Sequence, residues 1–245
     1  MIVAELNAEL RKLVTVRATY FILLLAFILE LIFAFWANGV KVVAGALQSP
    51  FFLQSQIVDA TSALGLIGAF VGVLMVTHEY RYSTIMYTLT ATNSRYKVLA
   101  AKVIVISLFA LVFTVVTAVL SPLLARLGIA INGASLAPQQ FVYSDFVWQV
   151  LFYGWGFSMI GLALALLIRN QVGTFASLLL LPGLAEQLLS LVLKSNSIYL
   201  PFSALDAVIH PSQRLGSGKA ALVFMAYVVI VWLAAALLFR KRDAN

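Results

Sequence analysis

The feature that most constrains this chain is a succession of apolar runs, each about as long as a bilayer is thick. An α-helix rises 1.5 Å per residue, so roughly 20 apolar residues cross a hydrocarbon core of about 30 Å. Six runs of this kind occupy residues 18–37, 57–76, 98–120, 146–168, 172–193 and 220–239. Only 10% of the residues are charged, against about a quarter in soluble domains. We therefore predict an all-α polytopic membrane protein whose six transmembrane helices form a single domain over residues 1–245.

The positions of the basic residues predict how these spans are oriented. If both termini face the cytoplasm, eleven of the 16 Lys and Arg residues lie on the inner side and five on the outer side. Such an excess on the inner side is the pattern of multi-pass membrane proteins. The net charge of +7 is thus explained by the membrane, and we expect no nucleic-acid partner. The prediction is a protein of the cytoplasmic membrane with both termini inside.

Residues 1–17 are expected to form an amphipathic helix that lies in the inner interface before the first span. Apolar residues recur in it at helical spacing, namely Ile2, Val3, Leu6, Leu10, Leu13 and Val14. Charged residues are expected to fill much of its other surface: Glu5, Glu9, Arg11 and Lys12. Because Glu5 and Glu9 are acidic and the first apolar run is long, the segment does not read as a cleavable signal peptide.

The longest polar interval, residues 77–102, separates the second and third apolar runs, and its aqueous part is residues 77–97. Ile85, Met86 and Leu89 fall there on one face of a short helix. An apolar face between two spans is a place where another protein can grip both spans at once. The alternative interpretation is an ordinary solvated loop.

Signals for helix ends flank this short helix. Ser83 or Thr84 is expected to cap its start, and residues 92–94 are expected to end it and to cap the third span. Four basic residues also fall in the interval: Arg81, Arg95, Lys97 and Lys102.

Two acids inside the apolar runs, Glu30 and Glu186, are candidates for function, because a carboxylate in a membrane span is costly. Glu30 is expected near the middle of the bilayer, whereas Glu186 approaches the outer interface. A structural, hydrogen-bonded role remains open for both. Gly68 and Gly72 have the spacing that permits close helix contact, and together with Glu30 they form a candidate substrate path.

Motifs of catalysis are missing from the aqueous segments. The sequence Gly-Ser-Gly-Lys at residues 216–219 lacks the glycine and the hydroxyl residue that a phosphate-binding loop requires, since Gln213 and Ala220 stand there. The two histidines, His78 and His210, are expected on opposite sides of the membrane, where they cannot share a metal. We therefore expect a non-enzymatic chain without its own cofactor or metal.

The order of these segments resembles an ABC-2-type transporter permease subunit over nearly the whole chain. The resemblance is sharpest in the central polar interval, at Glu79, Ser83, Thr84, Ser94, Arg95 and Lys102. The sequence departs from the family pattern at Ser83, where a glycine is frequent, and at residues 92–93, where a proline is frequent. The run Tyr-Leu-Pro-Phe at residues 199–202, in the outer loop 194–219, is similar to bacterial members.

The resemblance implies a bacterial half-transporter. A separate cytoplasmic ATPase would dock on the short helix, called the coupling helix in the family, and on the N-terminal segment. The ATPase would carry ATP and Mg²⁺, and two permease chains, identical or close paralogues, would face each other among membrane lipids with one ATPase each. Export of a hydrophobic or amphipathic cargo, such as a drug, a lipid or a peptide antibiotic, is implied.

The residues assigned to docking by this resemblance form two groups. The coupling group comprises Glu79, Arg81, Ser83, Thr84, Ile85, Met86, Leu89, Ser94, Arg95 and Lys102. The N-terminal group comprises Arg11, Lys12 and Arg17. We expect Glu79 to form an ion pair with the N-terminal group, first of all with Arg17.

Two other classes of protein compete with this interpretation. A secondary transporter or a channel subunit would work without an ATPase, but such proteins usually show several polar spans or an internal repeat. A membrane-embedded enzyme would need catalytic side chains clustered near one face of the membrane.

Overall fold

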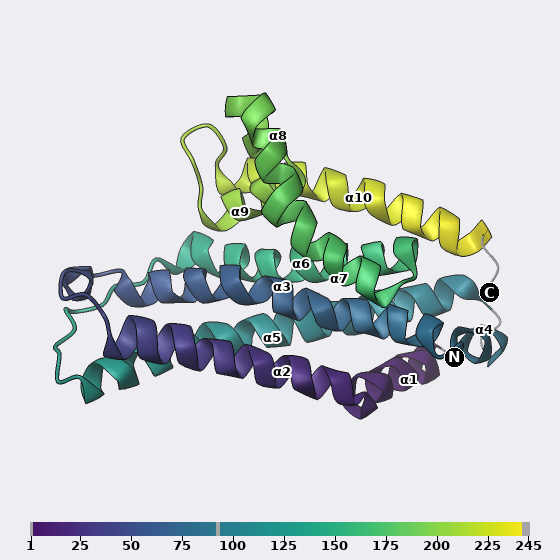
Figure 1. Cartoon of the computed structure of the whole chain (residues 1–245), viewed down its shortest axis with the longest axis horizontal. Helices are drawn as coiled ribbons and strands as arrows, with labels where there is room; N and C mark the ends of the chain where they lie inside the picture. The colour runs from purple at the N-terminus through teal and green to yellow at the C-terminus, as the bar shows by residue number, and fades with distance from the viewer. Residues whose placement is uncertain (1, 92–93, 242–245) are drawn as a thin grey trace.

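The computed structural model describes residues 2–91 and 94–241, and every regular element within them is helical (Figure 1). The elements are α1 (Ile2–Thr15), α2 (Arg17–Glu30), η1 (Leu31–Val40), η2 (Ala46–Gln48), α3 (Phe52–Arg81), α4 (Ile85–Ala91), α5 (Arg95–Ile131), α6 (Tyr143–Ile168), α7 (Gln171–Leu180), η3 (Leu181–Ala185), α8 (Glu186–Leu193), η4 (Lys194–Tyr199), α9 (Pro201–Ile209) and α10 (Ser217–Lys241).

Six helical segments in the described part of the chain are long and apolar enough to cross a membrane. They are Arg17–Val40, Phe52–Arg81, Arg95–Ile131, Phe146–Ile168, Gln171–Tyr199 and Ser217–Phe239. This confirms the predicted all-helical class and the six candidate spans. Helix α3 lies at the centre of the bundle, where it contacts α2, α5, α6 and α7.

The third span is longer than predicted. The sequence pattern placed its end at residue 120, but α5 continues through Pro122 to Ile131. Proline removes one backbone donor, and membrane helices tolerate this where neighbouring groups satisfy the freed carbonyl. The added turns are held by packing, because Ala125 and Ile129 are buried against the start of α3. The predicted end of the third span at residue 120 was therefore wrong.

A closer contact between helix backbones than at the predicted glycines occurs at Gly128 and Gly39. A Cβ atom added to Gly128 of α5 would lie 2.3 Å from a backbone oxygen of η1 and 2.7 Å from the Cα atom of Gly39. At Gly68 and Gly72 the nearest atoms would be 3.0 Å and 3.2 Å away, on α5 and α6. Only glycine permits the approach of η1 to α5, because any side chain would collide with backbone.

Two spans change their hydrogen-bonding pattern partway along. The first span passes from α-helix to π-helix directly after Glu30. The fifth span does so at η3, which contains Pro182 and Gly183. A π-helical turn is uncommon and often marks a functional site.

The predicted outer loop folds back onto the bundle. Its helix α9 buries Phe202, Leu205 and Val208, and it packs against α6 and α10. Part of this loop is therefore packed against the bundle.

Helix α1, helix α4 and the last turns of α10 lie at the same end of the molecule (Figure 1). At that end Arg95 Nη1, at the start of α5, donates a hydrogen bond of 3.2 Å to the carbonyl oxygen of Phe239 in α10. The six candidate spans account for this arrangement, because after an even number of spans the chain returns to the end of the molecule where it began.

Candidate functional site

The second span leads directly into the short helix. Helix α3 runs on to Arg81, a turn follows, and α4 begins at Ile85. Ser83 adopts a left-handed backbone conformation with a φ of 55°, which is costly for a residue with a side chain. The turn is closed by a hydrogen bond of 2.9 Å from the amide of Thr84 to the carbonyl oxygen of Glu79. The predicted short helix is thus present, and it is joined tightly to the second span.

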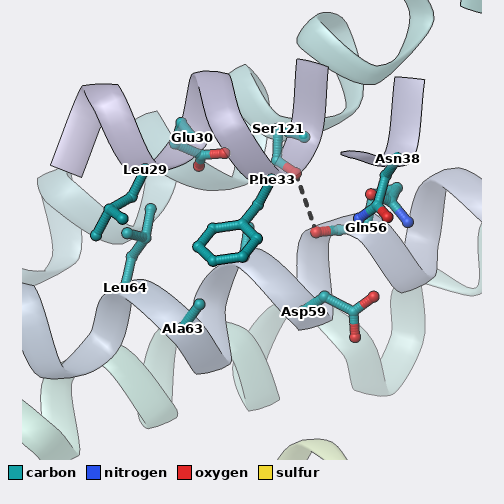
Figure 2. A pocket seen from close by; sticks show the side chains of 11 residues that line it. Leu29, Glu30, Phe33, Asn38, Gln56, Asp59, Ala63, Leu64 and Ser121 are labelled. Atoms are coloured by element: carbon teal, nitrogen blue, oxygen red, sulfur yellow. Dashed lines mark hydrogen bonds between the residues drawn. The ribbon is translucent and has the colours of Figure 1, made fainter. Parts of the chain in front are cut away.

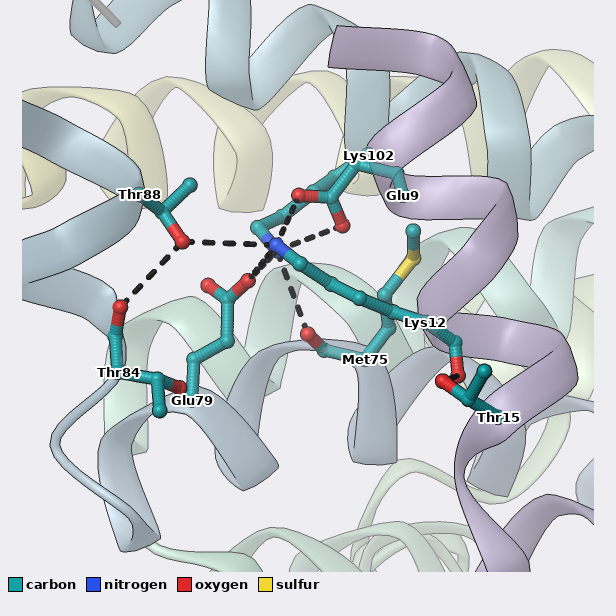
Figure 3. A network of polar contacts seen from close by, with 8 residues as sticks. All are labelled: Glu9, Lys12, Thr15, Met75, Glu79, Thr84, Thr88 and Lys102. Atoms are coloured by element: carbon teal, nitrogen blue, oxygen red, sulfur yellow. Dashed lines mark hydrogen bonds and ion pairs between the residues drawn. The ribbon is translucent and has the colours of Figure 1, made fainter. Parts of the chain in front are cut away.

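Beside this turn lies a group of four charged side chains, which we call the junction cluster: Glu9, Lys12, Glu79 and Lys102 (Figure 3). The ammonium nitrogen of Lys102 is 3.0 Å from Oε2 of Glu9 and 2.9 Å from Oε1 of Glu79. The ammonium nitrogen of Lys12 is 2.7 Å from Oε1 of Glu9 and also contacts Oε1 of Glu79. The negative charges of two carboxylates are therefore offset by the positive charges of two ammonium groups.

The junction cluster is withdrawn from solvent. The exposed fraction is 1% for Lys102, 2% for Glu9 and 4% for Glu79, while Lys12 lies at the edge with a third of its side chain exposed. Lys102 also donates a hydrogen bond of 3.3 Å to the carbonyl oxygen of Met75. A buried charge is costly unless partners of opposite charge satisfy it, so the four side chains depend on one another.

Three helices contribute to the junction cluster and a fourth touches it. Glu9 and Lys12 come from α1, Glu79 from α3 and Lys102 from α5. Lys12 lies 3.5 Å from the hydroxyl of Thr88 in α4. Burial alone would lower the pKa of Lys12, but the attraction of the carboxylates of Glu79 and Glu9 outweighs it and raises the pKa. The cluster thus ties the N-terminal helix to the helices on both sides of α4.

The expected ion pair between Glu79 and the N-terminal segment is confirmed, but the expected partner was wrong. Glu79 pairs with Lys12 and Lys102, whereas Arg17 is exposed at the start of α2. The α1 helix ends at Thr15 before the chain turns, so Lys12 is presented to α3 and Arg17 is not.

The assignment of faces on the N-terminal helix also needs correction. Glu9 was expected on the polar outer surface but is buried against α5. Leu10 and Val14, on the predicted apolar face, are 42% and 64% exposed, as a face that contacts lipid would be. The ion pairs of Glu9 with Lys12 and Lys102 fix which side of α1 faces the other helices. The spacing of Glu9 and Lys12, three residues apart on one helix face, was the available signal.

The apolar face of α4 divides between the core and the surface. Ile85 is 2% exposed and belongs to the main hydrophobic core, so it is unavailable for docking, contrary to the prediction. Met86 is 47% exposed, and the side chain of Leu89 lies outside the described residues. Tyr82 and Tyr87, which the sequence analysis passed over, are 56% and 76% exposed.

The other residues assigned to docking are dispersed. Arg81 lies 3.3 Å from the side-chain oxygen of Gln171 at the start of α7. Arg95 contacts α10, and Ser94 precedes α5 without a side-chain capping bond. Arg11 is exposed on α1. The structure therefore joins Glu79, Lys12 and Lys102 in one cluster but does not bring these other residues into it.

A second polar site lies in the first span, in a cavity of about 230 Å³ that we call the acid pocket (Figure 2). It lies between the first span, α3 and α5, and its lining comprises Leu29, Glu30, Phe33, Ala34, Asn38, Gln56, Asp59, Ala60, Ala63, Leu64 and Ser121. Glu30 is 3% exposed, and its Oε1 atom has no hydrogen-bond partner among the described residues.

Asp59 is the residue of the acid pocket that the sequence analysis missed, although it falls inside the second apolar run. The two glycines assigned with Glu30 to a substrate path do not line this pocket. They are buried where α3 meets α5 and α6. Ser121, which does line it, donates a hydrogen bond of 3.0 Å to the carbonyl oxygen of Gln56.

Glu186 has a structural role. Its carboxylate accepts hydrogen bonds from the amides of Phe202 and Ser203, at 2.7 Å and 2.8 Å, and from the hydroxyl of Ser203 at 2.7 Å. These are donors of the first turn of α9, which have no partner within their own helix. A negative charge is also favourable at a helix N-terminus. The carboxylate therefore fastens α9 to the fifth span.

No group of three or more His, Cys, Asp or Glu side chains suited to a metal ion occurs within residues 2–91 and 94–241. No family model matches the chain, and neither does any curated protein.

Proposed function

We propose that this chain is the permease subunit of an ABC-2-type exporter in a bacterial cytoplasmic membrane, with both termini in the cytoplasm. The observation that carries the proposal is the placement of α4. This short helix sits between two spans, and a buried ion-pair cluster ties the helices on both sides of it to α1 (Figure 3). A solvated loop would not require three buried charges to hold its ends.

The arrangement supports a mechanical role. A force on α4 passes through the closed turn at Ser83 into α3, and the junction cluster transmits it to α1 and α5. The surface offered to a cytoplasmic ATPase consists of Tyr82, Met86 and Tyr87, which are exposed around α4. ATP and Mg²⁺ bind to that ATPase, which hydrolyses the nucleotide. Two such permease chains, each with one ATPase, enclose the path of a hydrophobic or amphipathic cargo.

The docking surface is tested by Met86→Asp, which puts a charge on the exposed part of α4. The chain is expressed with its proposed partner ATPase, and the amount of ATPase that co-purifies is measured. Val43→Asp, at a side chain that is 75% exposed in the loop between η1 and η2, serves as the control. We expect Met86→Asp to lose most of the ATPase and Val43→Asp to keep it. Full co-purification and normal transport by Met86→Asp would refute the docking surface.

The orientation is tested by labelling. The chain has no cysteine, so Ser83→Cys and Ser217→Cys each provide a single thiol, in the turn before α4 and at the start of α10. In intact cells a membrane-impermeant thiol reagent should label only Ser217→Cys. Labelling of both variants from outside would refute the proposed topology.

A secondary transporter is the second candidate, and the acid pocket favours it, because carboxylates in a membrane span often serve coupled transport. Vesicles that contain this chain without any ATPase separate the two candidates. Uptake driven by an ion gradient alone would favour the secondary transporter, whereas transport that needs the ATPase and ATP favours the exporter.

A further inference from the structure

Glu30 is buried without a counter-charge. Glu30 is only 3% exposed, and its Oε1 atom has no hydrogen-bond partner in the described part of the chain. A buried acceptor in that state costs free energy unless a bound group supplies a donor. Because Glu30 lines a cavity (Figure 2), the missing donor has room to be a ligand.

The polar side of the acid pocket carries two carboxylates and lacks a basic side chain. Asp59 brings a second carboxylate from α3, and Asn38 and Gln56 add amide groups. No Lys, Arg or His is among the residues that line the cavity. His210 attracts the carboxylate of Asp59 from outside the lining. Two acids in a lining that itself holds no basic residue favour a positively charged ligand over a neutral or negative one.

The remaining walls are apolar. Leu29, Phe33 and Leu64 line the same cavity. An apolar cavity of about 150 Å³ can hold benzene, so the roughly 230 Å³ found here has room for an aromatic or aliphatic body beside the charged group. A proton would need no such space. No group of three His, Cys, Asp or Glu side chains that could hold a metal ion occurs among the described residues.

From the buried, unpartnered Glu30 carboxylate and the acid-lined, apolar-walled cavity, we infer that the acid pocket binds the protonated primary amine of a lipophilic molecule. The ammonium group donates to Glu30 Oε1 and to the polar groups around it, while the apolar body lies against Leu29, Phe33 and Leu64. The inference that this molecule is exported rests on the proposed function, because it assigns the cargo class as lipophilic amines. The binding site itself does not depend on an ATPase.

Binding is tested on the purified chain in lipid nanodiscs without ATPase, with radiolabelled 2-phenylethylamine as the probe near pH 7. At this pH the amine is protonated, while 2-phenylethanol has nearly the same size and no charge. We expect unlabelled amine to compete with the probe and 2-phenylethanol to fail at the same concentration. Equal competition by both compounds would overturn the assignment of a cation site.

Variants locate the bound amine. Glu30→Gln keeps the shape of the side chain and removes its charge, and a charged hydrogen bond is worth enough that we expect affinity to fall about tenfold or more. Ala63→Leu fills the cavity at an exposed position without changing charge and should also weaken binding. Asp206→Asn removes an exposed acid of α9 that is paired with His210 and should leave binding within about twofold of wild type. Wild-type affinity in both Glu30→Gln and Ala63→Leu would refute the site.

A transport measurement separates this inference from the proposed function. In vesicles that contain the chain and its ATPase, the amine should stimulate ATP hydrolysis and be transported, and Glu30→Gln should reduce both effects. If the amine binds at Glu30 but neither is transported nor affects ATP hydrolysis, the cargo assignment is wrong while the binding site stands. If the ATPase does not associate at all, the exporter proposal fails, whatever the nanodisc result.

Discussion

The junction cluster and the acid pocket bury carboxylates in opposite ways. At the junction cluster, Glu9 and Glu79 each contact two lysine ammonium groups. In the acid pocket, Glu30 has no partner in the described part of the chain, although it is equally buried. The first arrangement holds helices together, since every charge there is needed by another. The second adds nothing to the bundle by itself, so its carboxylate is available to a ligand. Exposure alone would not distinguish the two sites, whereas their partners do.

The largest effect is expected where a paired charge is removed. Lys102→Met takes away the only fully buried cation of the junction cluster, so Glu9 and Glu79 are left with Lys12 alone. Breaking a buried ion pair costs about 3–5 kcal/mol, and the midpoint of thermal unfolding in detergent should fall accordingly. Lys219→Met, at an exposed position, is the matched control and should behave as wild type.

A double variant sharpens this result. Lys102→Met combined with Glu9→Gln leaves one carboxylate and one ammonium group, Glu79 and Lys12, and should recover part of the lost stability. If the single variant unfolds at the wild-type temperature, the cluster does not hold the helices together.

Removal of the Glu186 carboxylate should have the next largest effect. Glu186→Gln replaces a charged acceptor of three hydrogen bonds by a neutral one, and we expect a loss of about 1–3 kcal/mol in the free energy of unfolding. The same thermal measurement checks it, with Asp206→Asn as the control on α9. A loss confined to Asp206→Asn would contradict the role of Glu186 in fastening α9.

Lys12→Met should cost less than Lys102→Met, because Lys12 lies at the edge of the cluster and Lys102 remains. An ion pair that is partly open to solvent contributes up to about 1 kcal/mol. The pKa of Lys12 is raised above 10.5, so its contribution is fully present below that pH and is lost as the pH rises through the folded-state pKa.

The pH dependence can be measured as the difference in unfolding midpoint between wild type and Lys12→Met. The difference should stay constant from about pH 7 to about pH 10 and should narrow at higher pH. A difference that instead grows above about pH 10 would mean that Lys12 is not held in its charged form by the two acids.

The smallest effect on stability is expected for Glu30→Gln. This variant breaks no ion pair and removes a buried charge without a partner, so stability should stay within about 1 kcal/mol of wild type or rise slightly. Thermal unfolding measures it beside Lys102→Met. A loss as large as that of Lys102→Met would show that Glu30 is a structural group, and the contrast between the two sites would disappear.

Much of the fold could be predicted because bilayer thickness sets the length of each span. The six apolar runs correspond to the six candidate spans of the structure. The end of the third span could not be predicted, because proline is a weak stop signal when the residues beyond it pack well. Pro122 is followed by Ala125, Gly128 and Ile129, and their contacts with α3 and η1 keep the helix going to Ile131.

The candidate sites were predictable in part. Glu30, Glu79 and Lys102 stood out because charges are rare in and beside apolar runs. The place of Glu9 inside the cluster was not predictable, because periodicity alone assigned it to the polar surface. Ile85 was assigned to docking for a similar reason, since an apolar face can turn either to a partner or to the core. Asp59 could have been predicted in the same way as Glu30, because it is also an acid inside an apolar run.

The sequence by itself determined the class of this protein and the number of its spans, because burial of backbone groups in lipid leaves a helix of about 20 apolar residues as the available solution. It also determined that charges concentrate beside α4 and that an acid lies within the first span. Only the tertiary structure decided which of those charges meet. Ion pairing depends on the few ångströms that separate Lys12 from Glu79 and Lys102 from Glu9, and these distances follow from how α1, α3 and α5 pack. That packing brought two ammonium groups to Glu79 and none to Glu30.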